Sequence, residues 1–477
     1  ERFQNVTPTQ SRSETSPNLA QGTSVNSLML GELYASYQKS SNGHNISATA
    51  GTSTQLVRGN YMDMTGIGFA STLESQLVMN NANVVNGGAG EIDTQGLLSY
   101  YLRGTYNFEN KYYMSATMRA DGSSIFADGK KWGYFPAVSA GWRISNEAFM
   151  SGSPVISNMK LNVGYGELGN QNVSAFQYLN IYRKDRRYFI NGNPVTGSRL
   201  GSFANPNITW ETAKTLNILL ETSFLDDKLV LNVAYFDKKT SGMLVSPVRN
   251  YTAGNETAIP QQNSGEMSNK GFELELSYGN QKGDFGYNVG MNATFLKNKL
   301  LALSDGIPYL ESGVSRTYVG EPIASFYGWK TAGIYQNQGQ IDNDVNIAED
   351  PRKGSITPGD VIFVDTNGDK LVDNEDRVNI GDGNPTALLG FYADFSYKGF
   401  NLSLLFSGAL GQELYDEMMM RGINAPETDG ADKVMLERWT GEGSTNKETG
   451  RSNLSRGVIF NNYPTSKTIT LGLDISF

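Results

Sequence analysis

The sequence TITLGLDISF, at residues 468–477, alternates apolar and polar side chains without a break. Successive side chains of a β-strand leave on opposite faces, so these residues predict a strand with one apolar and one polar surface. Two kinds of protein contain such strands. A soluble β-sandwich buries the apolar face, whereas an outer-membrane β-barrel turns it toward lipid and turns the polar face toward a lumen. The remainder of the chain decides between them.

The composition narrows the class of protein. The 477 residues include no Cys, and His44 is the single His, so disulfides, thiolate metal sites and multi-His sites or triads are excluded. The net charge of −9 argues against nucleic acid as a partner, because that partner needs a basic surface. No segment approaches the roughly 18–20 consecutive apolar residues of a membrane-spanning helix. The mean hydropathy of −0.39 does not exclude a barrel, because apolar and polar residues that alternate along a strand cancel in the average.

Thirteen segments have the period of two that indicates strands. They are Met29–Gln38, Asn45–Val57, Leu97–Phe108, Tyr112–Asp121, Tyr134–Arg143, Lys160–Leu168, Glu211–Phe224, Leu229–Thr240, Gly271–Gly279, Phe285–Leu296, Leu388–Tyr397, Phe400–Ala409 and Lys467–Phe477. In Gly271–Gly279, Leu274 belongs to the apolar face, and Glu273 and Glu275 belong to the polar face. That polar face is too polar for a dry core, so it is expected to face water while the apolar face meets hydrocarbon.

The connections between these segments alternate in length. Short ones, such as 40–43, 225–228, 280–283 and 398–399, are rich in Asn, Asp and Gly, which suit hairpin turns. Most of the others are far longer than the roughly 15 residues that compact soluble domains tolerate. Long extracellular loops opposite short periplasmic turns are typical of outer-membrane barrels. By the same alternation, 122–131 is expected outside and 145–159 inside.

This alternation also orients the two ends of the chain. The carboxy terminus is expected on the periplasmic side and the amino terminus outside. Residues 1–27, which are polar, are then expected to be the second half of an extracellular loop whose preceding strand is missing. Glu1 follows no initiator Met or signal peptide, so we expect a processed or cut chain that is part of a longer polypeptide.

Aromatic residues cluster beside two of the short turns. The first cluster comprises Tyr100, Tyr101, Tyr106, Phe108, Tyr112 and Tyr113, and the second comprises Phe391, Tyr392, Phe395, Tyr397 and Phe400. Barrels carry aromatic girdles where the wall meets the membrane interface, which is what we expect here. The alternative is the ordinary enrichment of aromatic residues in strands.

An acidic stretch in the longest loop has the spacing of a calcium-binding loop. Oxygen-bearing side chains or a backbone carbonyl are expected from Asp365, Asn367, Asp369, Leu371, Asp373 and Asp376. The stretch departs from the EF-hand pattern, because position 6 is Lys370 rather than Gly and position 12 is Asp rather than Glu. The hypothesis is a weak, structural calcium site; the alternative is a solvated turn rich in Asp and Asn.

No other motif indicates chemistry. The glycines at 164, 166 and 169 match a dinucleotide-binding pattern, but they lie within and at the end of a strand and no helix pattern follows. No paired carboxylates, nucleophile–base pair or phosphate loop stands out, so catalysis is not expected. The aromatic and polar segments Tyr178–Phe189, Tyr318–Tyr335 and Trp439–Gly441 suit a ligand, a partner or simple loop packing, and the sequence does not choose among these.

Several motifs together resemble a known family. Residues 119–149 read RADGSSIFADGKKWGYFPAVSAGWRISNEAF, and LNVGYGELGNQ at 161–171 and NITWETAKT at 207–215 follow in order. Further segments at 319–334, 358–381 and 390–399 complete the set. They resemble the SusC-like branch of TonB-dependent outer-membrane transporters of Bacteroidetes. The resemblance covers most of the chain and implies an all-β, transmembrane antiparallel β-barrel, which has 22 strands in the family.

The resemblance also implies a function. Residues 1–477 would be the carboxy-terminal part of the barrel, supplying 13 or more strands, while the plug and the carboxypeptidase-like domain would lie outside this chain. The whole transporter would import an oligosaccharide or oligopeptide, driven by TonB through the plug and capped by a SusD-like lipoprotein. The family usually has more strands between the segment at 438–440 and the last strand. Two alternatives remain open: a passive porin, and a soluble secreted adhesin or enzyme.

Overall fold

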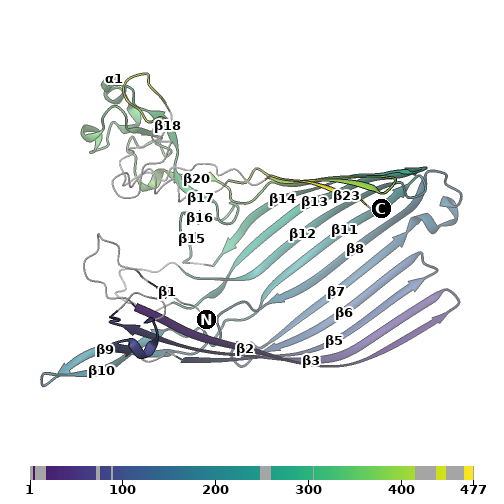
Figure 1. Ribbon diagram of the computed structural model, residues 1–477, viewed down its shortest axis with the longest axis horizontal. Coiled ribbons are helices and arrows are strands. Elements are labelled where there is room, and N and C mark those ends of the chain that lie inside the picture. Colours follow the sequence, from purple (N-terminus) through teal and green to yellow (C-terminus); the bar gives the residue numbers. More distant parts are fainter. Residues whose placement is uncertain are drawn as a thin grey trace.

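One antiparallel sheet dominates the computed structural model (Figure 1). The structure describes residues 4–5, 18–70, 76–86, 90–247, 259–304, 306–413, 437–446 and 467–475. The sheet has 15 strands, of which β1 (Gln4–Asn5) and β4 (Val84–Asn86) are short. The other thirteen are β2 (Asn18–Ser41), β3 (His44–Ile67), β5 (Gly90–Phe108), β6 (Tyr112–Ser123), β7 (Trp132–Arg143), β8 (Ile156–Asn170), β11 (Glu211–Phe224), β12 (Leu229–Val245), β13 (Gln262–Lys282), β14 (Phe285–Leu303), β21 (Ala387–Tyr397), β22 (Phe400–Leu410) and β23 (Thr468–Ile475).

These thirteen strands confirm the thirteen predicted segments, and each pairs with the next one in chain order. Several are longer than predicted. β2 begins at Asn18, so the expectation that residues 1–27 form a loop is wrong for 18–27. β12 and β13 likewise run on to Val245 and back to Gln262. Alternation could not reveal these extensions, because beyond the apolar band both faces of a strand meet water and both are polar.

The two ends of the strands differ as expected. Tight turns at one end contain residues with positive φ, such as Asn42 at 50° and Gly43 at 80°, or Lys398 at 44° and Gly399 at 83°. At the opposite end lie the long connections, including 171–210 and 304–386 (Figure 1). The connection 124–131 lies at this long-loop end and 144–155 at the turn end, which confirms the predicted alternation.

The long connections contain small folded elements of their own. β9 (Ile181–Ile190) and β10 (Asn193–Ser202) form a hairpin that projects beyond the wall (Figure 1). The segment 304–386, here called the loop-end extension, contains β15 (Leu310–Ser312), β16 (Ser315–Thr317), β17 (Phe326–Trp329), β18 (Thr331–Ile334), α1 (Gln338–Asp342), β19 (Val361–Phe363) and β20 (Arg377–Gly381). Of the helices in the described ranges, none has the length and apolar character required to span a membrane.

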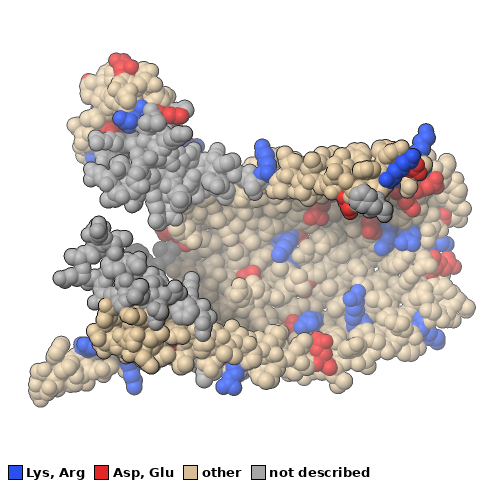
Figure 2. Space-filling view, viewed as in Figure 1, with Lys and Arg blue, Asp and Glu red and all other residues tan. Residues whose placement is uncertain are grey.

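The wall is a single curved layer with an apolar outer face and a polar inner face. Cross-strand pairing places Val233, Leu274, Ala293 and Leu389 in one continuous outer row. In β23, Leu471 is 70% exposed on the outer face. Figure 2 looks into the hollow of the sheet, where charged side chains stand among uncharged ones. The predicted facing of Leu274 and of Glu273 and Glu275 follows from this register; Ser476 and Phe477 lie outside the described residues.

The pairing register places members of both aromatic clusters on opposite faces of the sheet. Phe108 and Tyr112 are direct partners on the outer face beside one short turn, and their rings stack at 6.5 Å. Tyr397 and Phe400 are partners on the same face beside another turn. Tyr101, Tyr113 and Tyr392 instead have the parity of the inner face. The expected girdle therefore keeps only the members that alternate outward, because neighbouring residues in a strand cannot share a face.

Candidate functional site

A row of polar side chains crosses the inner face of the wall. Its members are direct cross-strand partners on β8, β11, β12, β13 and β14: Lys160, Glu221, Asn232, Glu275 and Asn292. The Lys160 Nζ lies 3.8 Å from a Glu221 carboxylate oxygen. The amide of Asn232 donates to Glu275 at 2.9 Å. The row presents donors, acceptors and both charges to the hollow, which suits water, a polar ligand or a polar protein segment.

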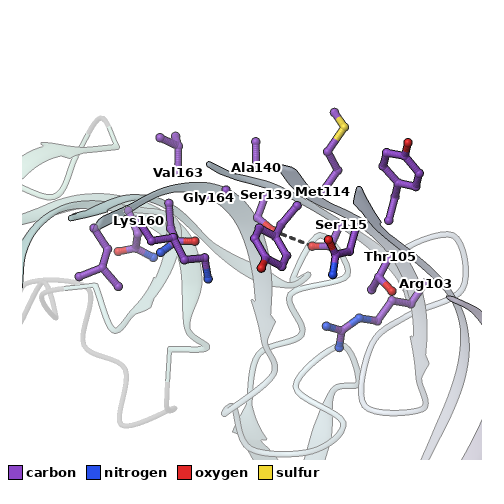
Figure 3. Close-up of a pocket in the computed structure, with 16 residues that line it drawn as sticks. Arg103, Thr105, Met114, Ser115, Ser139, Ala140, Lys160, Val163 and Gly164 are labelled. Carbon is purple, nitrogen blue, oxygen red and sulfur yellow. Dashed lines mark hydrogen bonds between the residues drawn. The ribbon is translucent and has the colours of Figure 1, made fainter. Parts of the chain in front are cut away.

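One end of this row opens into a cavity of about 490 Å³, shown in Figure 3. Tyr113 is among the residues that line it, with the Lys160 Nζ 4.8 Å and the Arg143 guanidinium 5.8 Å from the centroid of the Tyr113 ring. The hydroxyl groups of Ser115 and Ser139 share a hydrogen bond of 2.7 Å. Such a surface of cations, hydroxyl groups and one aromatic face fits an anionic or hydroxyl-rich group.

The two halves of the inner face differ in charge. Register places four cations on β5 to β8, at Arg103, Arg119, Arg143 and Lys160, where they outnumber the inner-face Asp93 and Asp121. It places acidic groups on β11 to β23, at Glu221, Glu273, Glu275, Asp394 and Asp474. The hollow is therefore polarised across its width, and an occupant with charges of both signs is oriented by this field.

The segment RADGSSIF, residues 119–126, joins neighbouring strands by side-chain contacts at the long-loop end. Arg119 binds Asp121 at 2.8 Å and the Ser99 hydroxyl at 2.9 Å, which ties β6 to β5. Phe126, fully buried, packs on Trp210 with ring centroids 5.4 Å apart. The Trp210 indole N–H donates to the Lys131 carbonyl at 2.9 Å. The contacts bring together segments 119–135 and 207–215, two of the segments that carried the family resemblance, and they explain those residues as packing rather than ligand binding.

Where the loop-end extension meets the wall, arginines and aromatic rings stack alternately. The Arg316 guanidinium lies 4.2 Å from the centroid of Tyr309 and 4.9 Å from that of Tyr327. Arg377 lies 5.0 Å from both Tyr327 and Trp329. Burial raises the pKa of Tyr327 to about 12. Tyr327 and Trp329 of the aromatic segment Tyr318–Tyr335 therefore pack within the extension.

The proposed calcium ligands lie in one exposed loop of the extension, where their oxygens accept backbone N–H groups. Asp365 accepts from Gly368 at 2.6 Å and from Lys370 at 2.8 Å. Asp376, fully buried, accepts from Thr366 at 2.7 Å and Asp373 at 2.8 Å. The remaining acceptors are Asn367, Asp369 and Asp373, each bonded to an N–H two residues on.

Within the described ranges, no three His, Asp or Glu side chains are grouped closely enough to hold a metal ion. Calcium at residues 365–376 stays a prediction.

The other two aromatic segments have separate places. Most of Tyr178–Phe189 lies in or beside the projecting hairpin, where Tyr182 is 70% exposed. Trp439 donates its indole N–H to Gln336 at 3.2 Å, so Trp439–Gly441 packs on the extension. The inner row was missed from the sequence except for Glu275, because its members are joined only by the register between strands.

Comparison with known proteins identifies similar chains. The family profile described as TonB dependent receptor-like, beta-barrel matches residues 2–358. TonB-dependent receptor P3 of Formosa agariphila is 29% identical over 464 residues, which cover 94% of this chain and 45% of that protein. TonB-dependent receptor SusC of Bacteroides thetaiotaomicron is 28% identical over 340 residues, covering 69% of this chain and 32% of SusC.

A solved structure shares the fold. The structure of the RagAB peptide transporter matches with a TM-score of 0.77 at 20% identity, covering 92% of this chain and 48% of the matched chain. This chain therefore spans less than half the length of each of these three proteins.

Proposed function

This chain belongs to the family of TonB-dependent receptor-like β-barrels, and on that basis we propose that it forms part of the wall of an energised importer. Membership confirms the predicted resemblance and places the protein in the bacterial outer membrane, in a family of transporters rather than enzymes. The alternative of a soluble secreted adhesin or enzyme is thereby removed. The observation that carries the proposal is the two-faced wall, with an apolar band outside and a polarised row of charges inside.

The proposed division of labour follows from the wall's geometry. A barrel of this size has a water-filled lumen unless another segment fills it. We assign residues 1–477 to the carboxy-terminal part of the barrel, and we assign the plug and the TonB contact to a remaining part of the transporter. The polarised inner face would hold that plug by charge complementarity, while the loop end would face the SusD-like lipoprotein lid.

The proposed cargo is an oligomeric nutrient, either an oligopeptide or an oligosaccharide. RagAB, whose fold this chain shares, is a peptide transporter. SusC, a sequence relative, carries a name that states TonB dependence but no substrate. The Tyr113 cavity accommodates either class, since its cations and hydroxyl groups suit carboxylates as well as sugar hydroxyl groups.

The test uses cells that produce the whole transporter and its neighbouring lipoprotein. Uptake of labelled oligopeptides and oligosaccharides is measured with TonB present and absent. We expect uptake of one class to fall to the background when TonB is lost. Uptake that persists unchanged without TonB would identify a passive porin instead. The mass of ligand released from the purified complex then separates peptide from glycan.

Calcium binding by residues 365–376 is a second proposal, and it rests on the spacing of the oxygen ligands. The whole transporter is compared in calcium and in a chelator by hydrogen exchange. Added calcium is expected to increase protection of amides 365–376, and magnesium is not. Asp365→Asn should abolish the increase, whereas Asp342→Asn, outside the loop, should keep it. An equal exchange rate in both buffers would rule the site out.

A further inference from the structure

A belt of lysines borders the apolar band on the outer face at the long-loop end. Tyr235, Phe272 and Phe295 form the last aromatic row of the band on β12, β13 and β14, and the first two rings lie 5.1 Å apart. The next outward positions on these strands are Asp237, Lys270 and Lys297, again direct partners. One step further lie Lys239 and Lys299, and on β11 Lys214 pairs with Lys239.

Acidic neighbours neutralise only part of this belt. Lys270 binds Asp237 at 2.8 Å, Lys239 binds Glu266 at 2.8 Å, and Lys214 binds Glu167 at 3.3 Å. Lys297 and Lys299 are exposed, and within the described part of the chain they have no ion pair. The belt therefore has two cations in excess, on a chain whose net charge is −9.

The arrangement is unfavourable without a further anion. Lys270 lies directly opposite Lys297, and Lys214 lies directly opposite Lys239. Like charges in such positions are about 5 Å apart at Cβ and destabilise the pair of strands. Lys297 and Lys299 are about 7 Å apart along β14. One anionic group can therefore reach Lys270, Lys297 and Lys299 together.

The position of the belt selects the kind of anion. The lysines adjoin an exposed apolar surface on the same face, where Phe272 is 56% and Phe295 49% exposed. A ligand that meets both surfaces has a charged head and a hydrocarbon body. We propose that Lys270, Lys297 and Lys299 bind the phosphate group of an outer-leaflet lipid, whose acyl chains lie against Phe272 and Phe295.

The experiment measures binding of phosphorylated lipid A to the whole purified transporter by native mass spectrometry. Lys297→Gln combined with Lys299→Gln should weaken binding roughly tenfold or more, because each lysine near an anionic surface contributes about 1 kcal/mol. Lys238→Gln is the matched control, since Lys238 is also exposed on β12 but has inner-face parity. It should leave the affinity unchanged. Heat-modifiable migration in gels confirms that each variant has assembled as a barrel.

Three outcomes would overturn the proposal. The first is equal binding of lipid A from which the phosphates have been removed, which would show that the apolar band suffices. The second is full competition by inorganic phosphate, which would show a site for a soluble anion. The third is an equal loss in the Lys238→Gln control, which would show a general effect of net charge.

Discussion

The wall and the loop-end extension are stabilised in different ways, although one chain forms both. In the wall, each side chain faces either lipid or the lumen, and the backbone ladder joins the strands. In the extension, Tyr335, Ile341, Ile347 and Val372 form a buried cluster of the kind found in soluble domains. The medium that each face meets, lipid or water, therefore determines which residue types the wall accepts. The extension depends instead on close packing of buried side chains.

The largest expected effect comes from shortening an apolar side chain to alanine, and it should differ between the two regions. Ile341→Ala should destabilise the extension by about 2–5 kcal/mol, because it leaves a cavity in a cluster where Ile341 is 1% exposed. Leu471→Ala on the wall, at a side chain that is 70% exposed, leaves no such cavity and should have a small effect. Hydrogen exchange in the assembled transporter measures both. Similar costs at the two sites would contradict the distinction.

A charge on the outer face tests the wall itself. Leu274→Arg should impair assembly, because arginine near the middle of the lipid-facing band costs about 2–4 kcal/mol. Glu273→Arg and Glu275→Arg, on the inner face of the same strand, should be milder. The fraction of heat-modifiable barrel in outer membranes gives the measurement. Equal tolerance at the three positions would show that the assigned facing is wrong.

Removing the charge of a buried carboxylate should destabilise the extension by a smaller amount. Asp376→Asn keeps the shape but removes the charge that accepts backbone N–H groups from Thr366 and Asp373, at a cost of about 1–3 kcal/mol. Limited proteolysis should then cut the loop 365–376 faster. Glu375→Gln is the control, since Glu375 is exposed, and it should leave the rate of cleavage unchanged. Identical rates in wild type and Asp376→Asn would argue against this role.

The smallest effect concerns pH at the arginine–aromatic stack. Because burial raises the pKa of Tyr327 from 10 to about 12, its neutral form contributes stability that is complete below pH 10. This contribution is lost as the pH rises from 10 to 12. Exchange rates of the extension should increase over that window in wild type and less so in Tyr327→Phe. The wall, compared in the same samples, should not share this change.

The sequence predicted the wall well and the extension poorly, for the same reason. Alternation has a period of two wherever two solvents meet the sheet, so β13 and β14 could be placed from residues such as Leu274 and Glu275. In the extension, β17 has only four residues, and its partner β20 follows about fifty residues later. No local sequence pattern therefore predicts their pairing. The same difficulty hid the inner row, whose residues Lys160 and Asn292 are joined only through register.

The alternation of β13 places two independent chemical requirements on neighbouring residues of one strand. Substitutions at odd-numbered positions such as Glu273 and Glu275 change the inner face of the wall, while the even-numbered Leu274 and Leu276 keep its outer face apolar. The lining of the hollow can therefore change in charge and shape while the lipid-facing surface of the same strand stays unchanged.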